Sequence, residues 1–335
     1  MQATSRRALG STGMEISRVG FGAWATGGHW RHGWGPQDDG ESVAAIGCAV
    51  AAGVNWIDTA PVYGLGHSEQ VVGSALADLP GDVRPYVFTK CGLLWDGPKG
   101  NEEVRRSLEP AGIRRELESS LRRLRIDAVD LYQVHWPPEE PPTPLEEYWQ
   151  TMVDLRREGK VRAIGLSNHD IGQLTTAEEI GHVDVLQPPL SAIRRDATAE
   201  IAWCAQRDTG VIIYSPMQSG LLTGAFSAER MSKLPAGDSR HHQDCFTTGL
   251  DANLALADAL APIADRHGVT RAAVAIAWTL AWQGVTGAIV GARNPAQVNG
   301  WIAGAELRLN DSDLDEVAAA IRRTGAGAGP DRPPS

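Results

Sequence analysis

The chain has 335 residues, of which 42% are hydrophobic and 21% are charged, and its formal net charge is −10. This composition argues against a disordered chain, and the acidic balance argues against a nucleic-acid binder, which would carry a basic stripe. The length allows either two domains of about 150 residues or one large α/β barrel. A chain of this size can bury a core without disulfides or a metal ion.

The N-terminal segment MQATSRRALGSTGMEIS is polar and lacks the apolar core of a secretory signal. We expect no membrane span, because no apolar run approaches the required length. The cysteines Cys48, Cys91, Cys204 and Cys245 are scattered, without a CxxC pair or a histidine at ligand spacing. We therefore expect reduced thiols in a cytoplasmic protein, with no disulfide framework and no metal site.

Short apolar runs separated by longer amphipathic stretches are the candidate strands. Several of these runs, such as VNWID, AIGLS and VIIYS, are continuous rather than alternating, which is typical of strands buried on both faces. In chain order the expected strands are Val19–Gly22, Val54–Asp58, Tyr86–Lys90, Val129–Val134, Ala163–Ser167, Val183–Leu186, Val211–Tyr214 and Ala288–Val290.

Helical patterns such as SVAAIGCAVAAG, PLEEYWQTMVDLRREG and TAEIAWCAQRDTG fill the intervals between these strands. In another, IRRELESSLRRL, the residues Ile113, Leu117, Leu121 and Leu124 share one apolar face. Eight strand–helix units joined by short loops predict an α/β fold in which a parallel sheet closes into a (β/α)8 TIM barrel. An open doubly wound sheet with a second domain is the alternative, but no linker divides the chain.

The two ends of the chain complete the predicted architecture. The segment RALGSTGMEISRVG reads as a short N-terminal β-hairpin that plugs the lower end of the barrel. An extra helix follows the last strand–helix unit, and residues 1–323 form a single barrel domain. We expect residues 324–335 to be a flexible tail, too rich in glycine and proline to pack.

A dinucleotide-binding fingerprint has to be weighed, because GFGAWA at residues 20–25 matches the pattern GxGxxA after a strand. The fingerprint requires a helix to begin at once, so that its N-terminal amides face a pyrophosphate. The sequence that follows, TGGHWRHGWGPQDDG, is instead typical of a loop. We therefore set the Rossmann interpretation aside.

Ionisable side chains follow the expected strands at the carboxyl end, where barrels carry their functional residues. Asp58 ends the second strand and Tyr63 lies in its loop, while Lys90 ends the third strand and His135 follows the fourth. Singly, these residues could be a turn cap, a snorkelling lysine or a core imidazole. Together they form a set suited to proton transfer.

The phenol of Tyr63 would be the proton donor of this set. A free tyrosine titrates near 10, which is high for acid catalysis at neutral pH. A neighbouring Lys90 ammonium would lower the pKa of Tyr63, and Asp58 would hold the ammonium in place. His135 could orient and polarise a carbonyl oxygen.

The motifs WIDTAPVYGLGHSE, VFTK, YQVHW, AIGLSN, VLQPP, YSPMQSGLLTG and IVGARNPAQV occur in the order found in the aldo-keto reductase superfamily. The chain resembles this superfamily from Gly20 to about Leu309, and GLLTG and GAR resemble its bacterial branch related to potassium-channel β-subunits. The resemblance implies a (β/α)8 barrel that binds NADPH without a Rossmann domain. It also implies that Tyr63 is the general acid, that Lys90 and Asp58 tune it, and that His135 positions the substrate carbonyl.

The same resemblance implies a set of cofactor-binding residues. Arg293 matches the arginine that contacts the adenosine 2′-phosphate, and Ser167, Asn168 and Gln187 match the residues that hold the carboxamide. The full set is Trp24, Ser167, Asn168, Gln187, Tyr214, Ser215, Met217, Ser219, Gly220, Leu222, Gly291, Arg293 and Gln297. Without the catalytic set, GLSN and YSP would read simply as strand ends followed by helix caps.

Three positions depart from the family pattern. Gly300 and Trp301 replace an acid and an amide that contact the adenine in the family pattern. Whether the protein strictly selects NADP over NAD therefore stays open, and Trp301 could stack on the adenine instead. Leu190 stands where relatives commonly have tyrosine. The four catalytic positions show no departure.

Tryptophan is over-represented, since its 11 copies exceed the 5 tyrosines and 4 phenylalanines combined. Trp24, Trp30, Trp34, Trp95 and Trp136 fall at or beyond strand ends, and of these we expect Trp24, Trp30, Trp95 and Trp136 to line the substrate pocket. The others lie in strand or helix patterns, where packing is the default role. They are Trp56, Trp149, Trp203, Trp278, Trp282 and Trp301.

The sequence thus predicts an NADPH-dependent reductase of aldehydes or ketones that favours bulky or aromatic carbonyls. An NADP-dependent dehydrogenase of a sugar, lactol or cyclitol is one alternative, and a cofactor-binding regulatory subunit is another. The expected partner is a small-molecule carbonyl compound, not nucleic acid or membrane, and a monomer and a homo-oligomer are both open. Residues 221–250 show no periodicity, and we expect a mobile loop that closes over ligand.

Overall fold

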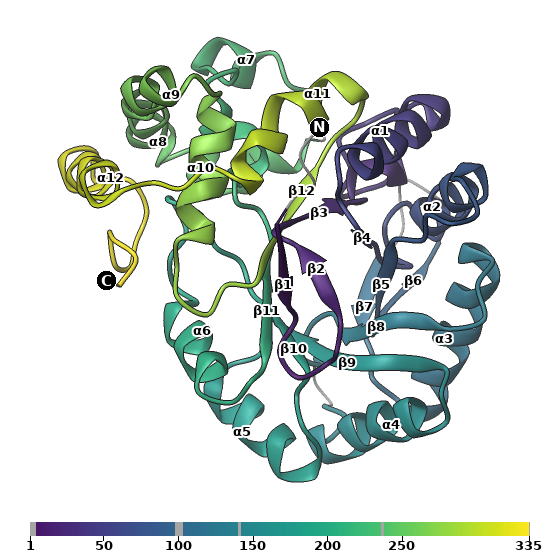
Figure 1. Ribbon diagram of the computed structural model, residues 1–335. Coiled ribbons are helices and arrows are strands. Elements are labelled where there is room, and N and C mark those ends of the chain that lie inside the picture. Colours follow the sequence, from purple (N-terminus) through teal and green to yellow (C-terminus); the bar gives the residue numbers. More distant parts are fainter. Residues whose placement is uncertain (1–4, 98–102, 140–141, 236–237, 335) are drawn as a thin grey trace.

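The computed structural model describes residues 5–97, 103–139, 142–235 and 238–334, and its centre is a closed barrel of parallel strands (Figure 1). Each barrel strand lies within two residues of a strand expected from the sequence, which confirms the (β/α)8 interpretation. Around the barrel the strands are β3 (Val19–Gly22), β4 (Trp56–Asp58), β5 (Tyr86–Cys91), β8 (Val129–Val134), β9 (Val161–Ser167), β10 (Val185–Gln187), β11 (Gly210–Ile213) and β12 (Gly287–Gly291).

Helices form the outer ring because their apolar faces cover the barrel wall (Figure 1). In α3 (Pro110–Leu124), the predicted face of Ile113, Leu117 and Leu124 is fully buried. The extra C-terminal helix is α12 (Asp311–Thr324), which packs against α8 (Leu250–Ala259). The remaining helices are α1 (Asp39–Ala51), α2 (His67–Asp78), α4 (Leu145–Arg157), α5 (Ile171–Ile180), α6 (Thr198–Ala205), α7 (Ala228–Ser232), α9 (Ala261–His267), α10 (Arg271–Leu280) and α11 (Pro295–Trp301).

The predicted N-terminal hairpin closes the lower end of the barrel. Its strands β1 (Arg6–Ala8) and β2 (Glu15–Ser17) lie across that end in Figure 1. Leu9 and Ile16 from the hairpin are fully buried against Trp56, whose indole nitrogen donates to the Ser17 carbonyl at 2.8 Å. The hairpin therefore seals the barrel with apolar side chains.

Inward-pointing side chains form an apolar layer below a polar layer. Side chains two residues apart on a strand share a face. The lower layer includes Trp56, Phe88, Leu131, Val185 and Ile212. Two residues further along the same strands stand Asp58, Lys90, Gln133, Gln187 and Tyr214. The strand geometry thus places an acid, an ammonium and two amides on one buried floor.

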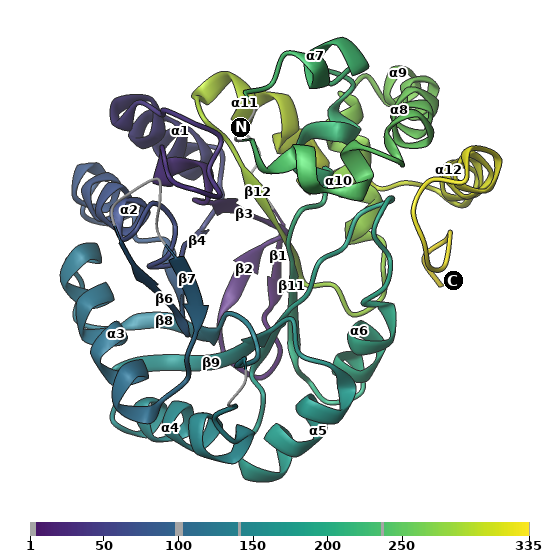
Figure 2. The same cartoon turned by 180° about the vertical axis from the view of Figure 1, so that it is seen from behind.

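A second hairpin, not predicted from the sequence, lies at the opposite end. Strands β6 (Leu93–Asp96) and β7 (Glu103–Arg106) follow β5 and lie to one side of the barrel opening, on the side of α2 and α3, in Figure 2. The aromatic and aliphatic side chains of Leu93, Trp95 and Val104 pack against Trp30. This hairpin becomes one wall of the site described below.

The glycines of the GFGAWA segment have a packing role. A Cβ on Gly20 would lie 2.2 Å from the Trp56 ring, and one on Gly22 would lie 2.7 Å from Ile289. The next α-helix after this segment is α1, which begins only at Asp39. The structure therefore agrees with setting the Rossmann interpretation aside.

The C-terminal segment differs from the expectation of an unpacked tail. Arg195, which is 2% exposed, donates to the carbonyl oxygens of Ala326 and Gly329 at 3.2 and 3.3 Å. Gly327 has φ +63°, and a Cβ there would collide with the carbonyl of Ile193. The glycines permit this close approach and a buried arginine supplies the donors, so the backbone from Ala326 to Gly329 is held against the barrel domain. Residue 335 lies outside the described residues.

The described parts of the segment 221–250 are also packed, whereas the lack of periodicity in its sequence predicted a mobile loop. Arg240 is 7% exposed and forms two hydrogen bonds with the Asp238 carboxylate, at 2.8 and 2.7 Å. The Phe226 and Phe246 rings meet edge to face, with centroids 5.1 Å apart. A local ion pair and an aromatic pair hold this segment, and neither produces a periodic pattern.

None of the helices in the described residues is long and apolar enough to span a membrane.

Substitution of two glycines tests the packed interior. We expect Gly20→Ala to lower the free energy of unfolding by about 2–3 kcal/mol, because the fully buried Trp56 ring occupies the space of the new methyl group. Gly47→Ala is the matched control, since a Cβ at this position of the helix α1 meets nothing within 4 Å. This substitution should raise the free energy of unfolding by as much as about 1 kcal/mol. Urea denaturation followed by circular dichroism gives both values; equal stability of the two variants would contradict this packing.

Candidate active site

A cavity of about 670 Å³ opens at the carboxyl ends of the barrel strands and reaches from the floor of the barrel to Arg293. Most of the residues singled out from the sequence line it. They are Trp24, Trp30, Asp58, Tyr63, His135, Trp136, Ser167, Asn168, Gln187, Tyr214, Ser215, Met217, Ser219, Gly220, Gly291, Arg293 and Gln297. Leu222 is an exception, because its side chain is fully buried in the core, and Lys90 lies beneath the cavity floor with no exposed surface.

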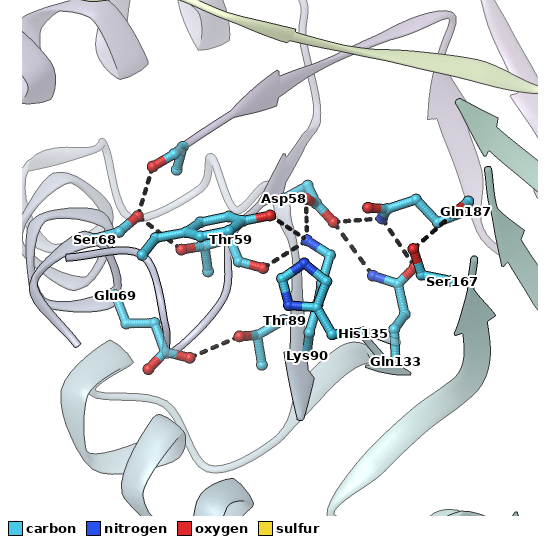
Figure 3. A network of polar contacts seen from close by, with 12 residues as sticks. Asp58, Thr59, Ser68, Glu69, Thr89, Lys90, Gln133, His135, Ser167 and Gln187 are labelled. Atoms are coloured by element: carbon cyan, nitrogen blue, oxygen red, sulfur yellow. Dashed lines mark hydrogen bonds and ion pairs between the residues drawn. The ribbon is translucent and has the colours of Figure 1, made fainter. Parts of the chain in front are cut away.

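The buried ammonium of Lys90 is the centre of the predicted catalytic set (Figure 3). Its Nζ donates to Asp58 Oδ1 at 2.5 Å, to the Thr59 carbonyl at 3.0 Å and to the Tyr63 hydroxyl at 3.3 Å. These contacts use all three protons that an ammonium has. Asp58 and Tyr63 raise the pKa of Lys90 despite the opposing effect of burial, so the side chain is charged at neutral pH.

The second carboxylate oxygen of Asp58 is held by two amides. Gln187 Nε2 donates to Asp58 Oδ2 at 2.9 Å and Gln133 Nε2 donates to it at 3.3 Å. Gln187 Nε2 also contacts Gln133 Oε1 at 3.0 Å, so the two amides orient each other. Our sequence reasoning missed Gln133, although it lies two residues before His135 and alternation places both on the inward face.

Tyr63 stands above the ammonium, at the edge of the cavity. Burial raises the pKa of Tyr63 above its ordinary value of 10.0, and the opposing effect of Lys90 is smaller. Lys90 lowers this pKa, as expected from the sequence, but burial outweighs it, and the depth of burial cannot be read from the sequence. The phenol is protonated at neutral pH.

His135 faces the phenol of Tyr63, with ring centroids 5.7 Å apart. Burial, together with the charges of Lys90 and Arg106, lowers the pKa of His135 well below 6.5. The imidazole is therefore neutral and carries one N–H. Its backbone N–H donates to Cys91 O at 3.0 Å and its own carbonyl accepts from Asn168 Nδ2 at 3.0 Å, which ties it to two other strand ends.

A second polar chain fixes the loop that carries Tyr63 (Figure 3). Ser68 Oγ donates to the Ala23 carbonyl at 2.7 Å and lies 2.8 Å from the Thr59 hydroxyl. Glu69, also buried, accepts from the Thr89 hydroxyl at 2.6 Å. The hydroxyls and the carboxylate thus join α2 to β4 and β5 next to the ammonium.

Ser167, Asn168 and Tyr214 form a separate group on the far side of the floor. The Tyr214 hydroxyl donates to Asn168 Oδ1 at 2.8 Å, and the Ser167 hydroxyl donates to the Gln187 carbonyl at 2.8 Å. Asn168 has φ +61°, a left-handed conformation that asparagine tolerates better than most residues. These contacts hold polar groups against the cavity next to Gln187.

The segment after β11 turns sharply along the cavity wall. Ser215, Gln218, Ser219 and Gly220 have φ values of +58°, +46°, +50° and +97°. A Cβ on Gly220 would meet nothing within 4 Å. Left-handed residues next to right-handed ones turn successive backbone amides toward one side, and such concavities bind anions.

Arg293 stands at the other end of the cavity and contacts the loop that follows β3. Its Nε donates to Gln37 Oε1 at 2.6 Å and its Nη2 donates to the Pro36 carbonyl at 2.5 Å. Gln297 Oε1 accepts from the Arg293 backbone N–H at 2.8 Å. The contact between Arg293 and Gln37 joins residues 256 positions apart, and no pattern in the sequence signals it.

The tryptophans divide as expected except that Trp34 lines the cavity and Trp95 does not. Trp24, Trp30, Trp34 and Trp136 line the cavity, and the Trp24 and Trp34 rings meet edge to face with centroids 4.6 Å apart. Trp95 does not line the cavity but packs behind it, against the cluster that contains Trp30. The packing role is confirmed for Trp56, Trp149, Trp203, Trp278, Trp282 and Trp301, all buried. Stacking of Trp301 on an adenine is therefore excluded by its burial.

The described residues hold no group of three or more His, Cys, Asp or Glu side chains that could bind a metal ion. The chemistry available in the cavity is that of a protonated phenol, a neutral imidazole and a buried ammonium–carboxylate pair. These groups can donate a proton to, and hydrogen-bond, an oxygen that enters the cavity. A large cavity with a cation at one end leaves room for an anionic ligand beside the reacting groups.

The amino-acid sequence of this protein is similar to those of known proteins along most of its length. The model of the aldo/keto reductase family matches residues 18–322. The chain is 33% identical over 319 residues to aldo-keto reductase YhdN of Bacillus subtilis (strain 168), covering 94% of this chain and 93% of that protein. It is 34% identical over 336 residues to NADH-specific methylglyoxal reductase of Escherichia coli (strain K12), covering 94% and 98%.

Solved structures agree with these matches. The glycerol dehydrogenase AKR11B4 from Gluconobacter oxydans superimposes with a TM-score of 0.87 at 35% sequence identity, and the match covers 98% of both chains. The thermostable aldo-keto reductase Tm1743, in complex with the inhibitor epalrestat, superimposes with a TM-score of 0.70 at 26% identity, covering 92% of this chain and 97% of that one.

Proposed function

Because this chain belongs to the aldo/keto reductase family and is therefore an oxidoreductase of carbonyl and alcohol groups, we propose that it reduces an aldehyde or ketone with NADPH and that Tyr63 supplies the proton. The observation that carries this proposal is the hydrogen bonding of Lys90. Its ammonium donates to the Tyr63 oxygen at 3.3 Å, so the phenol proton points away from Lys90. That proton is then available to an oxygen in the cavity.

The direction of the Tyr63 pKa favours reduction over oxidation at neutral pH. A reductase needs the protonated phenol before the reaction, whereas an alcohol dehydrogenase needs the phenolate as a base. Burial raises the pKa of Tyr63, so the phenol is the resting form. After the proton leaves, the Lys90 ammonium next to the oxygen stabilises the phenolate, and Asp58 keeps the ammonium in position.

His135 supports the same step without donating the proton itself. Its lowered pKa keeps the imidazole neutral, so it can offer an N–H to a carbonyl oxygen but does not carry a transferable positive charge. The ring lies edge to face with Tyr63. A carbonyl oxygen placed between the two rings would receive one hydrogen bond from each, which orients the carbonyl carbon toward the rest of the cavity.

The residues along the cavity fit an extended nicotinamide dinucleotide. Ser167, Asn168 and Gln187 would hold a carboxamide, Tyr214 would stack on the nicotinamide, and the left-handed turn at Ser219 would take the pyrophosphate. When bound, the nicotinamide supplies the hydride. The family uses nicotinamide cofactors, and the choice of NADPH rests on Arg293, whose planar cation suits a phosphate.

Oxidation of a polyol or sugar alcohol is the second candidate. A structure similar to this one is named a glycerol dehydrogenase, at 35% identity. The same phenol–ammonium pair would accept the alcohol proton in that direction, at a pH high enough to ionise Tyr63. Rates in both directions, measured at equal driving force, separate the two candidates.

Replacement of the phenol hydroxyl tests the proton donor. We expect Tyr63→Phe to lower kcat by about a hundredfold or more and to leave NADPH binding unchanged, because only the acid is removed. Tyr86→Phe, at the start of β5 and at the other end of the barrel, is the control and should retain turnover. NADPH absorbance gives the rates and nucleotide-dependent fluorescence gives the affinity. Turnover of Tyr63→Phe at the wild-type rate would refute the assignment.

Substrate preference follows from the walls of the cavity. The indoles of Trp24, Trp30 and Trp136 line the cavity that holds the reacting groups, and we expect aromatic aldehydes to exceed small aldoses in kcat/KM by about tenfold or more. A panel of benzaldehydes, glyceraldehyde, ketoses and α-keto acids, followed by NADPH absorbance, measures this preference. Higher kcat/KM values for small polar aldoses would contradict it.

A further inference from the structure

Arg293 is paired, but only with neutral oxygen atoms. Its Nε donates to Gln37 Oε1 at 2.6 Å and its Nη2 to the Pro36 carbonyl at 2.5 Å. In the part of the chain that the structure describes, its guanidinium forms no ion pair with a carboxylate within 4.0 Å. Its positive charge is therefore held in one place without being neutralised.

Gln37 is itself firmly anchored. Its Nε2 donates to the Arg293 carbonyl at 2.8 Å, and Ser42 Oγ at 3.1 Å and the Asp38 carbonyl at 3.2 Å are the acceptors within reach of its second proton. Asp38 is the N-cap of α1 and accepts from the Glu41 N–H at 2.8 Å. The amide of Gln37 thus bonds both the side chain and the backbone of Arg293 to the start of a helix.

We propose that Gln37 is a positioning residue for Arg293 and thereby sets the preference of this enzyme for NADPH over NADH. The inference rests on the proposed function, in which Arg293 receives the 2′-phosphate. Gln37 and Pro36 occupy the Nε–Nη2 edge of the guanidinium, and an arginine side chain has five N–H donors in all. Three of the five are outside these two bonds and can bind phosphate oxygens.

The chemistry of the amide explains why position 37 suits glutamine. A glutamate of the same length would accept the same hydrogen bond but would neutralise the guanidinium and repel a phosphate dianion. An aliphatic residue would leave the charge intact but would release the long, flexible arginine side chain. An uncharged hydrogen-bond acceptor such as the glutamine amide holds the Arg293 guanidinium in place and leaves its positive charge available to a phosphate.

The same contact joins the nucleotide end of the cavity to a wall of the substrate pocket. Gln37 ends the loop that carries Trp30, His32 and Trp34, all of which line the cavity. Trp34 packs edge to face on Trp24 with centroids 4.6 Å apart. We therefore expect nucleotide binding at Arg293 to change the fluorescence of Trp34 and Trp24, which gives a measurement independent of catalysis.

Dissociation constants of NADP⁺ and NAD⁺, measured by tryptophan fluorescence on the full-length protein, test the proposal. We expect Gln37→Glu to raise the Kd of NADP⁺ by about tenfold or more and Gln37→Leu to raise it by a smaller factor. The Kd of NAD⁺, which has no 2′-phosphate, should not change in either variant. Gln150→Glu on α4 adds the same charge at an exposed position and is the matched control.

A double-mutant cycle separates positioning from a general structural effect. In an Arg293→Gln background, Gln37→Leu should have no further effect on the Kd of NADP⁺, because the positioned group is already gone. An unchanged Kd of NADP⁺ in Gln37→Leu, or an equal rise for NADP⁺ and NAD⁺, overturns the role of Gln37 and leaves the proposed function intact. A wild-type protein that binds neither nucleotide overturns the proposed function itself.

Discussion

The buried ion pair between Lys90 and Asp58 is the interaction on which the rest of the site depends. Removing both charges from water is costly, and breaking such a pair leaves an uncompensated charge in the interior. The structure offsets this cost by giving every ammonium proton an acceptor and by donating two glutamine amides to the free oxygen of Asp58. The third ammonium proton then fixes the orientation of Tyr63, which couples the stability of the barrel floor to its chemistry.

The barrel places the side chains that stabilise it and the side chains that react in two adjacent layers. Below the ion pair, Trp56, Phe88 and the N-terminal hairpin form an apolar layer that keeps water from the lower side. Above it, the cavity is open to ligands and extends from Asp58 and Tyr63 to Arg293. A long anionic cofactor and a compact carbonyl compound can therefore occupy the cavity together without competing for the same groups.

The features of the fold and site that local sequence patterns determine were predictable from the sequence. Apolar runs located the barrel strands, and parallel strands bring their carboxyl ends together, so Asp58, Lys90 and His135 had to converge. Contacts between distant loops, such as that of Arg293 with Gln37, leave no periodic signal. The net direction of the Tyr63 pKa also had to come from the structure, because burial outweighs the neighbouring ammonium.

The central claim is that a protonated phenol, and not an imidazolium, delivers the proton. The pH dependence of kcat/KM for carbonyl reduction tests it most directly. Because burial raises the pKa of Tyr63 above 10.0 and lowers that of His135 well below 6.5, we expect a rate that is level through neutral pH and falls only in the alkaline range. A decline in kcat/KM as the pH rises from about 5 to about 7 would identify a histidine acid and contradict the account.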